Sequence, residues 1–350
     1  MNSTWESNSN IIEFAETVST YVIYNDILKK FLNIYKSRKK EIPILDLRKT
    51  TYISPAAVPV LLSFGDYLRR LYRKPISLYV SKESNLLNFL ISSRFIYIGK
   101  ELGIFNMDQT ILDSWKYKEL RDMHKVSYTN THYSDTDMIS DLIQRRNYIF
   151  DCLLDRTKVV YKSILNDTNQ LPEYIIDATI NSIAEIETNA IMYSTSYSFT
   201  YVASDKFGTQ ISIADSGVGF EKSFENQKRE LTLLKKFKRI EPRFRNFLVI
   251  MSAMNYSYLK HIDEDREDLW TLKTNIVNSN GVFKVHYRNT QVIFSNSRCK
   301  GCKKLVGEKD ISRCVRCLLE DYNTEQFSPI KLFEVGFQGV RIEVQINRGE

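Results

Sequence analysis

The sequence lacks three features that would take the protein out of the ordinary class of folded soluble chains. No apolar run approaches the roughly 18 residues needed to span a bilayer. The first ten residues carry neither the basic run nor the apolar core of a secretory leader. No internal repeat is visible. We therefore expect a cytoplasmic protein with no membrane partner.

Histidine and cysteine are also scarce. None of the 4 histidines lies in a His-Glu or His-Asp context followed by a dimerisation helix, which argues against a sensor kinase that phosphorylates its own histidine. Only 5 cysteines occur, and four of them fall in two Cys-x-x-Cys pairs within twenty residues. With 43% hydrophobic and 26% charged residues in 350, the composition is that of a folded protein with the length of two domains.

A net charge of +7 comes from a mild excess of lysine and arginine, with one dense stretch at 228–245. Such a stretch is compatible with nucleic acid or another polyanion as partner. A solvated helix face explains it more simply, so nucleic acid stays the less favoured alternative.

The first part of the chain alternates helical and strand patterns. Apolar runs at Ile42–Leu47 and Ile76–Val80 are typical of buried strands, and helical spacing is found between them. We predict helices at Ile11–Ser37, Ala56–Tyr72 and Ser84–Ser93, the last with Ser84 near its N-cap. This pattern predicts an α/β domain over residues 1–125, followed by a polar linker at 126–136.

Residues 137–350 are predicted to form a second α/β domain. The pattern predicts long helices at Asp137–Leu165 and Pro172–Ser194, followed by strands at Ser198–Ser204 and Gln210–Ala214. Further helices are expected at Phe247–Ser257 and Leu269–Ser279, and further strands at Val282–Tyr287, Gln291–Phe294 and Val340–Ile346.

The helix predicted at 172–194 has one polar stripe. Helical spacing places Glu185 and Asn189 on that stripe, with Ser182 beside them, while isoleucines fill the opposite side. An amide oxygen one turn from a carboxylate can ligate a hard cation bridging phosphates, and the carboxylate can take a proton from water. Glu187 falls on the apolar side, where a basic partner would be required.

Asp215 ends a predicted strand and is followed by Gly217 and Gly219. Glycines there let the backbone approach a flat ligand closely. An aspartate at this place can accept a hydrogen bond from an exocyclic amine such as that of adenine.

Taken together, these motifs resemble those of the GHKL ATPase superfamily, the histidine-kinase and Hsp90-like fold, over residues 136–295 and 335–347. The resemblance implies an α/β sandwich, a mixed sheet with helices on one face, that binds ATP with Mg²⁺. It implies Glu185 as catalytic base, Asn189 as magnesium ligand and Asp215 as adenine acceptor, with Gly217 and Gly219 beside the nucleotide. The family's second glycine box is replaced by a segment without glycine, 265–270, in which Arg266 or a lysine of the basic stretch is left to contact a phosphate.

The segment Leu45–Val58 resembles the strand-to-helix signature of STAS domains, the fold of anti-sigma-factor antagonists, over about residues 11–115. In that family a serine at the start of the helix is phosphorylated. Here Ala56 occupies that position, and Ser54 occupies that of the family's aspartate. The resemblance implies an interaction module with a protein partner.

The four paired cysteines have the spacing of a structural zinc site. Two Cys-x-x-Cys knuckles separated by eleven residues can close a tetrahedron of thiolates around Zn²⁺. We predict a zinc-binding insertion at 296–325, with the second pair starting a short helix; the four ligands would be Cys299, Cys302, Cys314 and Cys317.

Three functions remain open from the sequence. The first is a Mg²⁺-dependent ATP-binding regulatory protein, an ATPase or ATP-gated switch. The second is an anti-sigma-type serine/threonine kinase, and the third is a non-catalytic scaffold for nucleic acid or protein. Oligomerisation stays open in each case.

Overall fold

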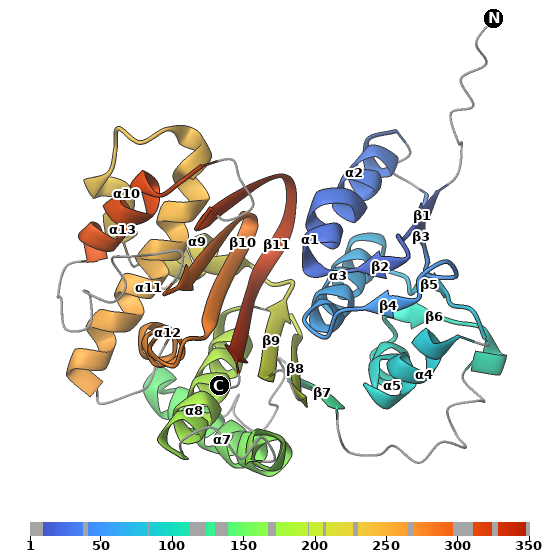
Figure 1. The fold of residues 1–350 in the computed structure, drawn as a ribbon, viewed down its shortest axis with the longest axis horizontal. Coiled ribbons are helices and arrows are strands. Elements are labelled where there is room, and N and C mark those ends of the chain that lie inside the picture. Colours follow the sequence, from blue (N-terminus) through green and yellow to red (C-terminus); the bar gives the residue numbers. More distant parts are fainter. Residues whose placement is uncertain are drawn as a thin grey trace, which may run out of the picture.

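The computed structural model describes residues 10–37, 41–82, 84–111, 124–129, 139–166, 173–194, 196–205, 208–226, 230–264, 269–296, 311–323 and 328–347. Within these ranges the protein is α/β, with a parallel sheet in its N-terminal part and an antiparallel sheet in its C-terminal part (Figure 1). None of the helices described is both long and apolar enough to cross a bilayer.

The N-terminal part contains a four-stranded sheet in the order β1-β3-β5-β6, and every neighbouring pair is parallel. A separate parallel pair joins β2 and β4. The elements are β1 (Ile11–Glu13), β2 (Thr17–Val18), α1 (Thr20–Val22), η1 (Ile23–Ile27), α2 (Leu28–Ser37), β3 (Ile44–Asp46), β4 (Tyr52–Ile53), α3 (Ala57–Tyr72), β5 (Ile76–Tyr79), α4 (Asn85–Ser92), α5 (Phe95–Glu101) and β6 (Phe105–Asn106).

Most N-terminal predictions are confirmed, with one error at the start. α3, α4, β3 and β5 lie where the pattern predicted them, and Ser84 caps α4 by accepting a hydrogen bond from Leu87 N at 3.1 Å. The helix predicted from Ile11 is wrong in its first residues, which form β1 and β2. Ile12 and Phe14 are buried while Glu13 is exposed, an alternation of period two that belongs to a strand.

The C-terminal part contains a five-stranded sheet in the order β10-β11-β9-β8-β7. Its elements are β7 (His124–Thr129), α7 (Leu142–Asn166), α8 (Glu173–Asn189), η3 (Ala190–Ser194), β8 (Ser198–Asp205), β9 (Gly208–Asp215), α9 (Gly219–Asn226), α10 (Thr232–Lys236), η4 (Pro242–Phe244), α11 (Arg245–Glu264), α12 (Leu269–Asn278), β10 (Val282–Ser295), α13 (Ile311–Glu320) and β11 (Ile330–Asn347).

Two predictions about this part are corrected. All four pairs of neighbouring strands in this sheet are antiparallel, so the mixed sheet predicted for it is wrong. The predicted linker also begins too early, because residues 124–129 form β7 and pair with β8. The polar composition suggested a linker. An edge strand, however, pairs with only one neighbour, so it can be largely polar and still form part of the sheet.

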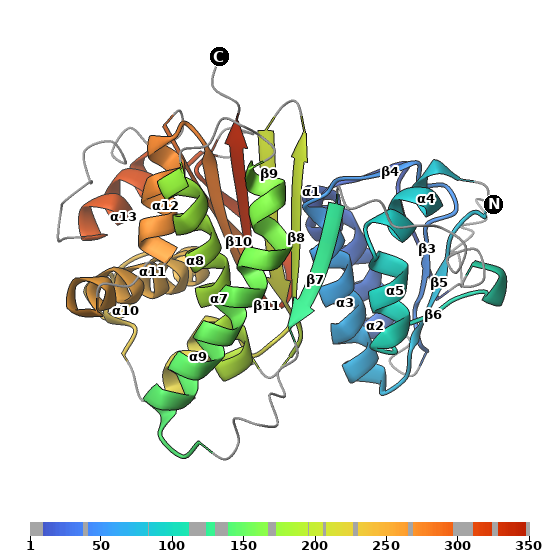
Figure 2. The ribbon, with the colours of Figure 1, turned by 90° about the horizontal axis from the view of Figure 1, so that it is seen from below.

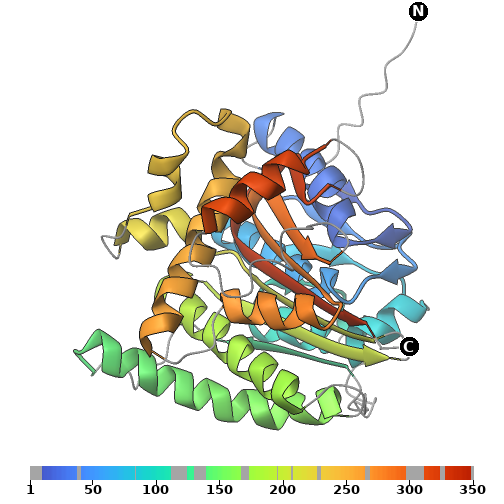
Figure 3. The ribbon, with the colours of Figure 1, turned by 60° about the vertical axis from the view of Figure 1, so that its left-hand side comes forward.

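The five-stranded sheet is covered on both faces. Val202, Ile211 and Ile213 pack with α7, α8, α11 and α12 on one face, and the green helices α7 and α8 lie side by side in Figure 3. The alternate side chains Phe199 and Tyr201 pack against the N-terminal part, where α3 lies on β8 and β9 (Figure 2). Helices of the C-terminal part therefore cover one face, and the N-terminal part covers the other.

Polar contacts also join the two parts. Ser212 Oγ donates to the carbonyl of Ala56 at 3.0 Å, and Lys29 pairs with Glu334 at 3.1 Å. The ring of Tyr24 stacks on His286 with centroids 3.6 Å apart. Hydrogen bonds and an aromatic stack thus hold one arrangement of the two parts.

Candidate functional site

Glu185 lies in the last turns of α8 and is buried. Its Oε1 forms an ion pair with the guanidinium of Arg146 on α7, and the two side chains are only 9% and 8% exposed. The other oxygen, Oε2, is buried and accepts no hydrogen bond within the described part of the chain. The predicted base is therefore held by a cation on one side and has one oxygen left to accept a proton.

Asn189 is the last residue of α8 and is partly exposed. No described residue forms a hydrogen bond with its amide, so its oxygen can serve a ligand. The next residues widen into the π-turn η3, where a continuous α-helix had been predicted. Such turns often occur at functional sites. α9, which begins in the glycine motif, packs against η3 and so brings the two predicted motifs together.

Asp215 ends β9 on the face that carries Ile211 and Ile213, which is the face covered by α8. Its Oδ1 accepts a hydrogen bond from Gly217 N at 2.8 Å, and Val340 N also donates to the carboxylate. Burial raises the pKa of Asp215 to about 6, while these two donors and the charge of Arg70 oppose the rise. At neutral pH the group is mainly an anion held at the end of a buried strand.

Glycine is required at two places beside Asp215. Gly219 has φ +74° and begins α9, and a Cβ there would lie 2.6 Å from the ring of Tyr287. Gly339 has φ +112°, and a Cβ there would lie 2.0 Å from the carbonyl oxygen of Asp215. Because backbone cannot move aside as a flexible side chain can, Gly339 is what lets β11 approach the end of β9.

Sequence reasoning missed the contacts of Ser216, which follows Asp215 and faces the N-terminal part. Its hydroxyl and its carbonyl both accept hydrogen bonds from Arg70 of α3, and its hydroxyl donates to Asp66. The spacing of Asp66 and Arg70 at i and i+4 is a local signal for an ion pair. No local pattern indicates that the pair contacts a serine 146 residues away along the chain.

The buried glutamate on the apolar side of α8 has found partners. Glu187 Oε1 accepts a hydrogen bond from Thr200 Oγ1 at 2.5 Å, and the charge of Arg156 acts on the same carboxyl. Burial nevertheless raises the pKa of Glu187, because neither partner offsets the loss of water. Glu187 therefore joins α8 to β8, whereas Glu185 joins α8 to α7.

Residues 221–268, which follow the glycine motif, are largely helical where they are described. Glu221 in α9 pairs with Arg245 and Arg288, each at 2.8 Å, and accepts a hydrogen bond from Tyr287 at 3.2 Å. These contacts tie α9 to α11 and β10. Arg266, the candidate phosphate contact, lies outside the described residues.

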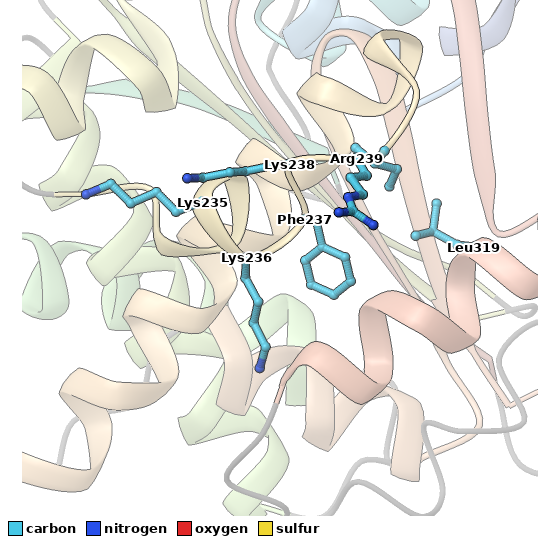
Figure 4. A pocket seen from close by; sticks show the side chains of 7 residues that line it. Lys235, Lys236, Phe237, Lys238, Arg239 and Leu319 are labelled. Atoms are coloured by element: carbon cyan, nitrogen blue, oxygen red, sulfur yellow. The ribbon is translucent and has the colours of Figure 1, made fainter.

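The basic stretch borders a pocket of its own. A cavity of about 390 Å³ is lined by the end of α10, by the turn after it and by Leu319 of α13. Figure 4 shows the ring of Phe237 and the side chain of Arg239 toward Leu319, while Lys235 and Lys238 point to the other side. The residues of the two nucleotide motifs do not line this pocket, whereas lysines of the basic stretch, the alternative phosphate contact, do.

The zinc prediction falls only partly within the described residues. Cys299 and Cys302 lie outside them, and no cluster of three or more metal-binding side chains occurs within them. Cys314 is fully buried and Cys317 partly buried, three residues apart on α13. The helix begins at Ile311, so the expectation that the second cysteine pair starts it is wrong by one turn.

Comparisons of the chain with family models, with curated proteins and with solved structures find no match. The chemistry of the residues themselves is therefore what supports a function.

Proposed function

We propose that this protein binds Mg·ATP and acts as an ATP-gated regulatory switch. The observation that carries the proposal is the carboxylate of Asp215, held at the end of β9 by Gly217 N and Val340 N on the sheet face covered by α8. A fixed anionic acceptor beside close-packed backbone suits the exocyclic amine of adenine.

The amide of Asn189 would hold the magnesium ion. It lies where α8 gives way to η3, next to the helix that follows the glycine motif. A carboxamide oxygen is a hard donor of the kind that Mg²⁺ accepts, and the ion would neutralise phosphate charge there. The residues present therefore fit a magnesium–nucleotide complex.

Glu185 would accept the proton of water or of a substrate hydroxyl through Oε2. Its other oxygen is held in the buried ion pair with Arg146, so Oε2 is the oxygen left for this role. Because one oxygen of the proposed base is held in a buried ion pair, we place an ATP-gated switch ahead of a fast ATPase.

The test is thermal stability with and without Mg·ATP, in the wild type and in Asp215→Asn. Saturation at about 100 times Kd should stabilise the wild type by about 2.7 kcal/mol, and the variant should lose this gain. A wild type whose melting temperature does not change at millimolar Mg·ATP would rule the proposal out.

Transfer of phosphate to protein is the alternative outcome of nucleotide binding. The backbone of Ala56, at the position of the STAS phosphoserine, is engaged by Ser212, and the residue has no hydroxyl. An acceptor would therefore lie on a separate STAS-like protein. ATP labelled at the γ-phosphate distinguishes the cases, because label on protein indicates a kinase and free phosphate an ATPase.

A second candidate function is nucleic-acid binding at the pocket beside α10. Lys238 and Arg239 are exposed and form no ion pair with a described residue, and the ring of Phe237 lines the same pocket. Aromatic and cationic side chains together suit single-stranded nucleic acid. Binding of an oligonucleotide that falls steeply with salt and is lost in Lys238→Ala/Arg239→Ala would support it.

We further propose that Zn²⁺ is held by Cys299, Cys302, Cys314 and Cys317. Cys314 and Cys317 lie one turn apart on α13, which packs against α11. Four thiolates leave no open coordination position, so the metal would staple the insertion to the domain and take no part in chemistry.

A further inference from the structure

Helix α3 of the N-terminal part reaches the glycine motif of the C-terminal part through two charged side chains. Asp66 is completely buried and pairs with Arg69 at 2.7 Å and with Arg70 at 3.1 Å. Arg70 Nη2 donates to Ser216 O at 2.5 Å and to Ser216 Oγ at 2.6 Å, and Ser216 Oγ donates to Asp66 Oδ2 at 3.0 Å. Each of the three groups is thus fixed by the other two.

Ser216 connects this network to the proposed nucleotide site, because it directly follows Asp215. Successive side chains of a strand point to opposite faces, so Asp215 faces α8 while Ser216 faces α3. Ser216 is fully buried, and its backbone carbonyl is held as well as its hydroxyl. A guanidinium that grips the main chain here fixes the turn from Asp215 to Gly217, because the planar fork of arginine has little freedom once it is paired.

We propose that Arg70, oriented by Asp66, is a positioning residue for the nucleotide loop, so that the N-terminal part completes the nucleotide site. The inference rests on the proposed ATP binding and adds a regulatory route to it. If docking of α3 favours the conformation that binds nucleotide, nucleotide must favour docking of α3 to the same extent. A protein partner that binds the N-terminal part and undocks α3 from the sheet would then weaken nucleotide binding. Bound nucleotide would in turn weaken the binding of that partner.

The chain provides a matched control one residue away. Arg69 also pairs with Asp66, but its guanidinium lies over the ring of Tyr197, and no hydrogen bond to Ser216 is among its described contacts. Neutralising Arg69 removes one partner of Asp66 and leaves the contact with the loop. Neutralising Arg70 also removes one partner of Asp66, and in addition it removes the contact with Ser216.

The experiment measures the affinity of the full-length protein for adenylyl imidodiphosphate with Mg²⁺, by calorimetry, in the wild type, Arg70→Gln and Arg69→Gln. We expect Arg70→Gln to weaken binding about tenfold, within the usual range of coupling between sites, and Arg69→Gln to leave it within about twofold. Should Arg70→Gln fail to fold, Ser216→Ala gives the test, because it removes only the hydroxyl contacts and should weaken binding about threefold.

A pH profile separates positioning from a general loss of stability. The charged or titratable groups acting on Asp215 are Arg70 from α3 and Tyr24 from η1, beside the N–H groups of Gly217 and Val340. Arg70 lowers the pKa of Asp215, so its neutralisation should move the acidic limb of nucleotide binding to higher pH. Arg69→Gln should leave that limb in place.

The outcomes are distinct. Equal affinities and equal pH profiles in Arg70→Gln and Arg69→Gln, with a wild type that binds, would overturn the positioning role and leave ATP binding intact. A wild type that does not bind the analogue would overturn both. A selective loss in Arg70→Gln, with the shifted acidic limb, supports the inference.

Discussion

The carboxylate of Glu185 and the guanidinium of Arg146 form an ion pair between α8 and α7 with both side chains more than nine-tenths buried. Two charges removed from water depend on each other, because each alone would face a large desolvation cost. The pair therefore couples the packing of α7 to the position of the residue proposed as base.

Removing one member of this pair should be strongly destabilising. Arg146→Met leaves the buried carboxylate without its cation, and we expect a loss of about 3–5 kcal/mol in the free energy of unfolding. Urea unfolding followed by circular dichroism measures it.

The double variant Arg146→Met/Glu185→Leu should recover a large part of that loss, since no unpaired charge remains. Lys158→Met is the control, because Lys158 is exposed on the same helix. A double variant no more stable than Arg146→Met would show that the ion pair does not account for the loss.

Asp215 should cost stability in the absence of nucleotide. Its pKa is about 6 in the folded protein against an ordinary value of 3.8, so the native state binds the proton more tightly than the unfolded chain does. For a carboxyl with a raised pKa, stability falls as pH rises through the interval between the two values.

Asp215→Asn should then stabilise the nucleotide-free protein at pH 7.5 by about 1–3 kcal/mol and have little effect near pH 4, while nucleotide binding is lost. Melting curves at the two pH values check this. Destabilisation at pH 7.5 would indicate that the hydrogen bonds from Gly217 and Val340 outweigh the cost of burial.

Gly339 and Gly103 allow the cost of a backbone clash to be separated from the cost of a left-handed conformation. Both have positive φ, +112° and +59°, but a Cβ at Gly103 meets no atom within 4 Å. We expect Gly103→Ala to cost about 1–2 kcal/mol and Gly339→Ala about 3 kcal/mol or more. If chemical denaturation gives similar losses of stability for the two variants, β11 can shift away from Asp215 at no energetic cost.

The stack between Tyr24 and His286 should make the contact between the two parts sensitive to acid. Burial holds the pKa of His286 well below its ordinary range, and the nearby Arg341 adds to the effect. His286 binds a proton near pH 6.5 in the unfolded chain but stays neutral in the native state. The free energy of unfolding therefore falls as pH drops below that value, by up to about 1.4 kcal/mol per pH unit.

His286→Phe keeps the ring contacts with Tyr24 and Phe333 and removes the titrating group. Its stability should fall less than that of the wild type between pH 7.5 and pH 5. Parallel pH profiles in urea unfolding would assign the acid sensitivity to other groups.

Metal analysis tests the zinc site. The purified protein should contain about one zinc ion per chain, and Cys317→Ser should reduce that content and lower the melting temperature. Cys152→Ser, on α7 and outside the four paired cysteines, should leave both unchanged. A protein free of zinc after purification without chelators would remove the site.

The sequence predicted those elements whose periodicity is local. α3, α8, β8 and β9 were found because their apolar residues recur at helical or strand spacing. β7 was missed because its residues are polar, and pairing with β8 makes it a strand. The strand directions were likewise missed, since periodicity does not encode which neighbour a strand joins.

The partners of the site residues could not be predicted from the sequence either, because they come from distant parts of the chain. Arg146 meets Glu185 across 39 residues, and Arg70 meets Ser216 across 146. Such contacts depend on how whole elements pack. The motif residues could be chosen from chemistry alone, whereas the groups that hold them required the fold.

Finally, the shared apolar layer has a consequence for the order of events during synthesis. Phe333 and Phe337 of β11 pack with Tyr24 and Phe64, more than two hundred residues earlier in the chain. A nascent chain emerges from its amino end, so α3 leaves the ribosome long before its covering sheet is complete. The N-terminal part must wait, with aromatic surface uncovered, until nearly all of the polypeptide has been made.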